Sequence, residues 1–202
     1  MKQPIPRAAA CVLLLCCAML AACAGLKKPE SDMFDLGLPR PATGMPALPP
    51  LALADVQAPE WLDTPAIYYR LAYASELQPR RYANSRWSMP PAQLFAQRLK
   101  ARIGQAGGAL LAASDGAVGV PVLRLEADEF SQVYDSPEHS AGLVEMRLSV
   151  LDGRRLLGQR SFTRRVSTQT ADAAGGVAAL AQASDAVIGD MLQWLASLPM
   201  KP

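Results

Sequence analysis

The chain has 202 residues, which suits one domain of about 100–200 residues with its own hydrophobic core. It carries 20 lysine and arginine residues against 18 aspartate and glutamate residues. This balance leaves little basic excess to offset phosphate charge, so a nucleic-acid-binding protein is disfavoured.

Residues 1–22 follow the pattern of a secretion signal. Lys2 and Arg7 supply positive charge, Ala8 to Met19 is apolar, and a Leu-Ala-Ala-Cys sequence ends the run at Cys23. The run is shorter than the roughly 20 apolar residues of a transmembrane helix. An ordinary secretory signal with a chance cysteine is the less favoured alternative, because the sequence matches the bacterial lipobox at every position. We therefore predict cleavage before Cys23 and attachment of lipid to its thiol.

Processing at Cys23 would leave a single, lipidated cysteine, because the other three cysteines lie in residues 1–22. No disulfide and no cysteine-based metal site is then expected. The cut also removes two basic residues and no acid, which leaves 18 side chains of each sign. Two or more acyl chains would hold the protein stably on a membrane. Ala24 stands where an aspartate usually retains such proteins in the inner membrane, which favours the periplasmic face of the outer membrane.

The remaining chain divides into a tether and one domain. We expect the lipidated cysteine and a flexible tether over residues 23–32, and a single domain over residues 33–202 whose first part, residues 33–50, is rich in proline. Within that part, apolar residues alternate over residues 34–38, which predicts a short first strand.

Short strands follow. The pattern predicts strands at residues 50–56 and 67–72, the second paired with residues 80–83 around a turn at residues 75–79.

A helix comes next. Pro90-Pro91 suits its first turn, and Gly107-Gly108 its end. Its apolar face is expected to consist of Ala92, Phe95, Ala96, Leu99 and Ile103. Polar side chains are expected elsewhere on the helix, at Gln93, Gln97, Lys100 and Arg102.

The second half of the chain predicts three more strands. Apolar and polar residues alternate over residues 123–127 and 144–150, so each strand has one dry face. The segment from 136 to 142 joins them. Asp152-Gly153 predicts a hairpin turn into a third strand at residues 155–167.

Apolar residues at helical spacing over residues 174–198 predict a long amphipathic helix. Such a helix needs a hydrophobic partner, and the dry face of the sheet is the natural one. The predicted fold class is therefore α+β, with an antiparallel or mixed sheet and two helices packed on one face.

Nothing in the sequence favours catalysis. The one histidine, His139, lies in a predicted surface loop, and the mature chain would have no free thiol. No glycine-rich phosphate loop, metal-ligand spacing or nucleophile motif is present. We therefore expect no enzyme activity, no cofactor and no metal.

Five arginines form the main charge cluster, at Arg154, Arg155, Arg160, Arg164 and Arg165. One interpretation is contact with anionic lipid headgroups or an acidic partner. The favoured interpretation is a solvated face that protects the edge of the sheet.

The segment from Trp61 to Leu94 is the most distinctive. It contains Trp61-Leu62-Asp63, Ile67-Tyr68-Tyr69-Arg70, Tyr82-Ala83-Asn84-Ser85-Arg86-Trp87 and Pro90-Pro91. These residues, with Phe34-Asp35-Leu36-Gly37 and the closing helix, resemble the ABC-type transport auxiliary lipoproteins, the group that includes the PqiC-like proteins.

The resemblance implies a role without catalysis. Proteins of this kind accompany an ABC permease, its ATPase and a membrane-anchored MCE-domain protein, and together these move phospholipids or other hydrophobic molecules across the Gram-negative envelope. The lipoprotein would dock on the MCE component, and a ring-like homo-oligomer would suit a conduit. Two alternatives stay open: an assembly or scaffolding lipoprotein of the outer membrane, and a periplasmic hydrolase.

Six residues of this segment are candidates for partner binding. Trp61, Tyr68, Tyr82 and Trp87 combine large apolar bodies with polar tips, and Arg70 and Arg86 could stack on them. The same residues could instead form a core and its rim. We favour the core for Tyr68 and Trp87, and leave Trp61 open.

Overall fold

The computed structural model describes residues 31–39, 44, 46–116 and 119–200. The predicted signal peptide at residues 1–22, the predicted lipid site at Cys23 and nearly all of the predicted tether lie outside these residues. The folded unit begins at Ser31.

In the described residues, eight strands form one mixed sheet. Their bounds are β1 Asp32–Phe34, β2 Leu51–Leu53, β3 Ala66–Leu71, β4 Ser75–Trp87, β5 Leu110–Ala112, β6 Val122–Tyr134, β7 Ser140–Asp152 and β8 Arg155–Ser167. The central strand is β6. One of its sides pairs with antiparallel β7, which in turn pairs with β8. Its other side pairs with β2 near Val122 and with β3 near Tyr134, both in parallel. Beyond these lie β5 on one end and β4 and β1 on the other.

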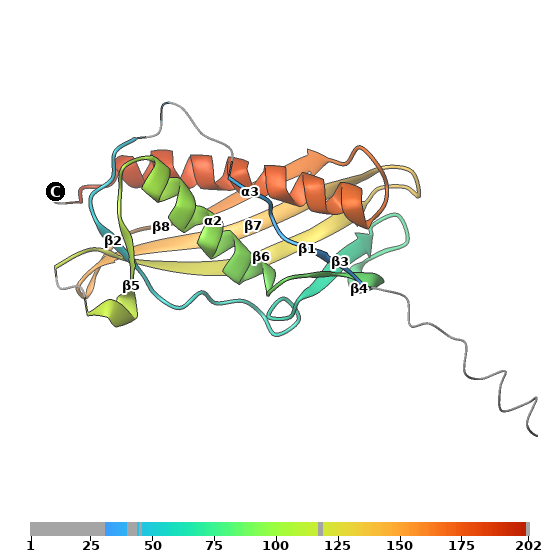
Figure 1. Ribbon diagram of the computed structural model, residues 1–202, viewed down its shortest axis with the longest axis horizontal. Coiled ribbons are helices and arrows are strands. Elements are labelled where there is room, and N and C mark those ends of the chain that lie inside the picture. The colour runs from blue at the N-terminus through green and yellow to red at the C-terminus, as the bar shows by residue number, and fades with distance from the viewer. Residues whose placement is uncertain (1–30, 40–43, 45, 117–118, 201–202) are drawn as a thin grey trace, which may run out of the picture. The chain divides into compact units, whose positions relative to one another are not determined.

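Two helices, α2 (Pro91–Gln105) and α3 (Ala173–Ala196), cover one face of this sheet (Figure 1). A short 3₁₀ turn spans Ala113–Asp115. The predicted α+β class, with both helices on one face, is confirmed. Among the described residues, no helix is long and apolar enough to cross a membrane.

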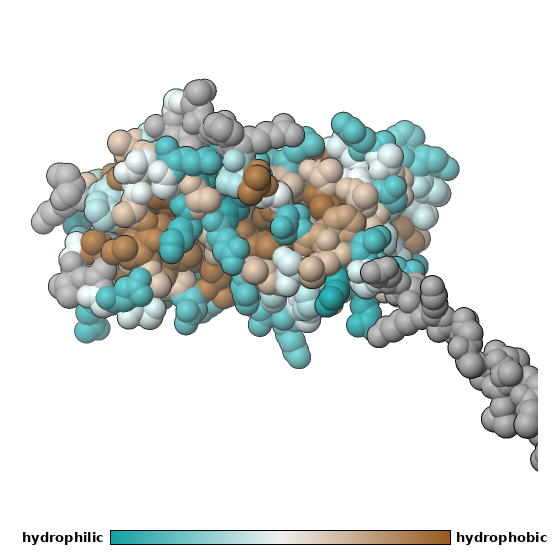
Figure 2. Space-filling model, in the orientation of Figure 1, coloured by the Kyte–Doolittle hydropathy of each residue, from teal (hydrophilic) through white to brown (hydrophobic). Residues whose placement is uncertain are grey.

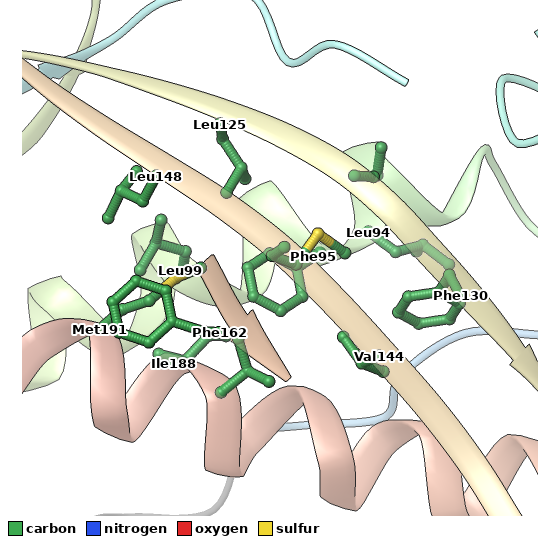
Figure 3. Packing of buried hydrophobic residues seen from close by; sticks show 14 of the residues in the cluster. Leu94, Phe95, Leu99, Leu125, Phe130, Val144, Leu148, Phe162, Ile188 and Met191 are labelled. Atoms are coloured by element: carbon green, nitrogen blue, oxygen red, sulfur yellow. The ribbon is translucent and has the colours of Figure 1, made fainter. Parts of the chain in front are cut away.

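The core lies between the helices and the sheet (Figure 3). Phe95 and Leu99 of α2 meet Ile188 and Met191 of α3, and all four are fully buried. Burying such a side chain contributes about 1.5–3 kcal/mol. The sheet supplies Leu125, Phe130, Val144, Leu148 and Phe162. The residues that the alternating and helical sequence patterns predicted to be buried therefore form the core.

The contact between α3 and β7 is unusually close at Gly142. A Cβ atom there would lie 2.7 Å from the backbone nitrogen of Leu180 and 2.8 Å from the carbonyl carbon of Ala179. Glycine is required because any side chain would push α3 away from the sheet. The helix starts at an N-cap, Asp172, whose carboxylate accepts a 2.7 Å hydrogen bond from the Gly175 amide.

Two local predictions were wrong, and one short strand was missed. Residues 75–79 belong to β4, and the turn is at Ala72–Ala74. Pro79 is tolerated there because the β3–β4 register shifts between Tyr69 and Leu71, so its missing N–H interrupts no regular pairing. The first strand ends at Phe34, because the chain then leaves the sheet for the helices. Strand β5 was not predicted.

Candidate partner-binding surface

Trp61, Tyr68 and Arg70 form one cluster. The rings of Trp61 and Tyr68 meet edge to face with centroids 5.1 Å apart, and the Arg70 guanidinium lies 5.2 Å from the Trp61 ring centroid. Arg70 also pairs with Glu129 at 2.9 Å and donates to the Glu76 carbonyl at 3.0 Å. Because the guanidinium lies over the indole and is also paired with a carboxylate, its position is restricted from both sides.

This cluster lies on the sheet face away from the helices. On β3, Tyr68 is opposite Ser131 and Tyr69 is opposite Gln132. The Gln132 side chain reaches Gly176 of α3, so Gln132 and Tyr69 point toward the helices. Alternation along the strand then places Tyr68 and Arg70 on the other face.

A short turn before β3 places Trp61 at this site. The Leu62 amide donates to the Pro59 carbonyl at 2.8 Å, and the Leu62 side chain is fully buried. Leu62 therefore holds the turn in the core, while the neighbouring Trp61 stays partly exposed. Trp61, Tyr68, Arg70 and Glu129 together make up the aromatic–arginine cluster.

Tyr82 does not join this cluster. Its hydroxyl donates to Gln132 Oε1 at 2.8 Å and lies 2.8 Å from the Tyr134 hydroxyl. Its ring lies 4.7 Å from that of Tyr69. Tyr82 thus belongs to a polar ladder under the start of α3, which continues from Gln132 to Ser140. Burial, followed by the hydrogen bond to Tyr134, raises the pKa of Tyr82 well above the usual tyrosine value.

The raised pKa of Tyr82 predicts weakening in alkali. Tyr82 stays protonated in the folded protein, whereas in the unfolded chain it ionises near pH 10, its ordinary value. Its contribution to stability is therefore intact below about pH 10 and falls as the pH rises further. We expect Tyr82→Phe to flatten this fall in urea unfolding measured across alkaline pH. Tyr73→Phe, at an exposed tyrosine, is the control, and an unchanged slope in Tyr82→Phe would contradict the assignment.

The last two predicted residues are separate again. Trp87 is 1% exposed and packs edge to face on Phe130, with centroids 5.7 Å apart, so it is a core residue, as favoured. Arg86 is exposed on β4, opposite Ala66 and Met33. The structure therefore brings together three of the six predicted residues.

A buried charged network links the two helices and was not predicted from the sequence. Arg98 binds both oxygens of Asp185, at 2.9 and 2.7 Å, and Arg102 binds Oδ1 at 3.1 Å. Both arginines are 6% exposed, so Arg102, which falls outside the predicted apolar face, is nevertheless buried. Burial raises the pKa of Asp185, but the hydrogen bonds and charges of the two arginines lower it more, so it lies below the usual aspartate value. Arginines four residues apart beside the apolar face were the available signal.

The same network fastens the segment that follows β1. Arg98 Nη1 donates to the carbonyls of Leu36 and Gly37 at 3.0 and 2.6 Å. Leu36 is buried, and Gly37 has a φ of 70°, which glycine adopts without strain. The start of the domain is thus held between the two helices.

Four of the five clustered arginines lie on β8, which pairs only with β7 among the described strands, and Arg154 lies in the turn before it. Arg164 pairs with Asp190 of α3 and Arg165 with Asp135, while Arg160 lies over the Phe162 ring. β8 is thus an edge strand with charged side chains among the described strands, and protection of that edge stays a prediction. His139 lies exposed in the β6–β7 turn, as predicted.

A hollow in the surface lies beside α2. It has a volume of about 260 Å³ and is bounded by α2, β2 and β5. Apolar patches are visible around α2 in Figure 2. The apolar lining includes Leu53, Val56, Ala96, Leu110 and Leu111. Within the part of the chain that the structure covers, no three His, Cys, Asp or Glu side chains are grouped as a metal site would require.

Comparison with solved structures supports the fold. A Xanthomonas campestris protein of the DUF330 family is 21% identical, with a TM-score of 0.69 over 81% of this chain and 94% of that one. A second, uncharacterized protein is 17% identical, with a TM-score of 0.64 over 82% of this chain and 98% of the other. No curated protein sequence matches the chain. The family model for the ABC-type transport auxiliary lipoprotein component matches residues 35–191, and the chain therefore belongs to that family.

Proposed function

We propose that this protein is a non-catalytic auxiliary subunit of an ABC/MCE-type system that moves phospholipids or other hydrophobic molecules across the Gram-negative envelope. The observation that carries the proposal is the family match over residues 35–191, which spans α2, all strands from β2 to β8, and α3 as far as Met191. The partners are an MCE-domain protein and, through it, an ABC permease and ATPase.

The lipid anchor is the second part of the proposal. Cys23 follows an apolar signal and a complete lipobox, so the mature protein would be held by its acyl chains. We place it on the periplasmic face of the outer membrane because Ala24 follows the cysteine. From there it would meet the MCE protein at the end of the transport path, as a single subunit or a ring of identical ones.

The aromatic–arginine cluster is the proposed docking surface. A partly exposed tryptophan with a fixed arginine is the kind of group that contributes most to protein interfaces. The Trp61 ring is already packed against Tyr68, and Arg70 is already held by its ion pair with Glu129. Little side-chain conformational entropy would therefore be lost on binding. Tyr82, Trp87 and Arg86 are not part of this proposed surface, because none of them shares a hydrogen bond, ion pair or ring contact with Trp61, Tyr68, Arg70 or Glu129.

The proposal predicts that the mature protein co-elutes with an MCE-domain protein of the same organism. Trp61→Ala should weaken this complex by about 2 kcal/mol, roughly thirtyfold in Kd. The measurement is size-exclusion co-elution followed by calorimetric titration. The control is Trp194→Ala, which removes a partly buried tryptophan of α3 that packs on Phe162 at 5.6 Å.

Two results would count against the proposal. Recovery of a β-barrel or cell-wall component in place of an MCE protein would favour the scaffolding alternative. Equal weakening by Trp61→Ala and Trp194→Ala would leave the transport partner in place but remove the aromatic–arginine cluster as its docking surface.

A further inference from the structure

We propose that the outer edge of the sheet formed by β1, β4 and the β3–β4 turn rests on the anionic surface of the bilayer that holds the lipid anchor. This membrane edge comprises Met33, Tyr73, Leu77, Arg80, Arg81 and Arg86. The inference rests on the proposed lipidation of Cys23 and goes beyond the proposed transport role.

The length of the tether places this edge near the membrane. Eight residues, Ala24 to Ser31, separate Cys23 from Asp32, and even fully extended they reach about 30 Å at most. Strand β1 is parallel to β4, with Asp32 opposite Ser85. The chain therefore enters β1 from the side of the β3–β4 turn.

The membrane edge exposes large apolar side chains, which a folded domain usually buries. Leu77 is 90% exposed, Met33 63% and Tyr73 49%. Exposed apolar side chains gathered beside an anchor can enter the headgroup region, where tyrosine is also favoured.

Cations accompany these apolar residues. Arg80, Arg81 and Arg86 are exposed on β4, and none forms an ion pair with a described carboxylate. In contrast, Arg164 and Arg165 on β8 each have an acidic partner. Two carboxylates, Glu76 and Asp32, also lie on these strands, so the excess is one positive charge and the electrostatic part of binding should be modest.

The backbone of β4 also remains open at this edge. Within the described residues, only Ser85 to Trp87 pair with β1, so the residues before them have no partner on that side. Unpaired N–H and C=O groups must be hydrated, and the water-rich headgroup region can supply that hydration. Pro79, Arg80 and Arg81 would meanwhile oppose pairing with another strand.

The opposite end of the sheet provides a matched control. The β7–β8 turn carries Arg154, and β8 begins with Arg155 and Leu156, which is 56% exposed. Leu151, just before that turn, lies opposite Val122 at the start of β6, whereas the β3–β4 turn lies by Tyr134 at its end. Figure 1 shows the two turns at opposite ends of the sheet. The same residue types therefore occur at both ends, but the chain enters β1 from the side of only one of them.

The test uses the mature chain with Cys23→Ser, so that binding does not depend on acyl chains. It is mixed with vesicles of phosphatidylglycerol and phosphatidylcholine in equal parts, or of phosphatidylcholine alone, and sedimented. We expect weak, salt-sensitive binding to the anionic vesicles. Combining Arg80→Ser and Arg81→Ser should lower this binding about tenfold, and Leu77→Ser should also lower it. Arg154→Ser with Arg155→Ser, and Leu156→Ser, should leave it unchanged.

Equal losses at both ends, or no binding to anionic vesicles, would overturn the inference. The protein could instead bind the MCE protein in preference to vesicles, and lose that binding in the Arg80/Arg81 variant. This result would assign the edge to an acidic protein partner and would also overturn the inference. Circular dichroism checks that each variant folds. The intact mass of the native protein tests Cys23 separately, and co-elution with the MCE protein tests the transport role separately.

Discussion

Asp185→Ala is expected to lower the free energy of unfolding by about 3–5 kcal/mol. The change leaves Arg98 and Arg102 buried beside each other without the carboxylate that now binds both. It also loosens the hold of Arg98 on the carbonyls of Leu36 and Gly37. Urea unfolding followed by circular dichroism measures the loss.

Asp190→Ala is the control for this prediction. Asp190 is on the same helix and pairs with Arg164, but both side chains are about a third exposed or more, so its loss should cost less than about 1 kcal/mol. Similar losses in the two variants would mean that the buried network contributes no more than a surface ion pair.

The pH dependence of stability provides a second check on Asp185. Its pKa is lower in the folded protein than in the unfolded chain. Its contribution is therefore present above the ordinary aspartate value, near pH 4, and is lost as the pH falls through the folded value. Asp185→Ala should remove this part of the acid dependence, whereas Asp190→Ala should retain it.

Trp87→Ala is expected to cost about 3–5 kcal/mol, because it empties a fully buried site beside Phe130. Trp87→Phe should cost much less, about 1 kcal/mol. The indole Nε1 of Trp87 is buried and has no hydrogen-bond partner in the described residues. Replacing it with phenylalanine removes an unsatisfied donor, which offsets part of the lost packing.

Trp87→Phe also separates stability from binding. Since Trp87 lies in the core, this variant should bind the MCE protein as the unmodified chain does, unlike Trp61→Ala. Thermal unfolding and co-elution on the same samples test both statements. Equal stability losses for Trp87→Ala and Trp87→Phe would show that ring volume does not set the cost.

The local pattern was sufficient for the long elements. Strict alternation in residues 123–127 and 144–150 reflects one face buried by helices and one in water, and both strands are present with that orientation. Asp152-Gly153 forms the predicted turn, with Gly153 at a φ of 58°. Helical spacing predicted both helices to within a few residues. These elements were predictable because their periodicity comes from a single buried face.

Short elements were not predictable in the same way. Strand β5 has three residues and exists because β2 lies beside it. The turn before β4 was misplaced because Pro79 suggested a turn, although a shifted register at an edge tolerates it. The candidate surface shows the same limit: Tyr68 and Tyr82 share an aromatic segment, but strand alternation sends them to opposite faces.

By itself, the sequence determined the two long helices, the alternating strands and the α+β class. These elements each bury one face, so their apolar residues recur at a regular spacing along the chain. The tertiary structure alone decided which distant side chains meet. It paired Arg70 with Glu129, brought Tyr82 to Gln132, and buried Arg98 and Arg102 around Asp185. Those contacts join segments far apart in the chain, and no local spacing records the register that brings them together.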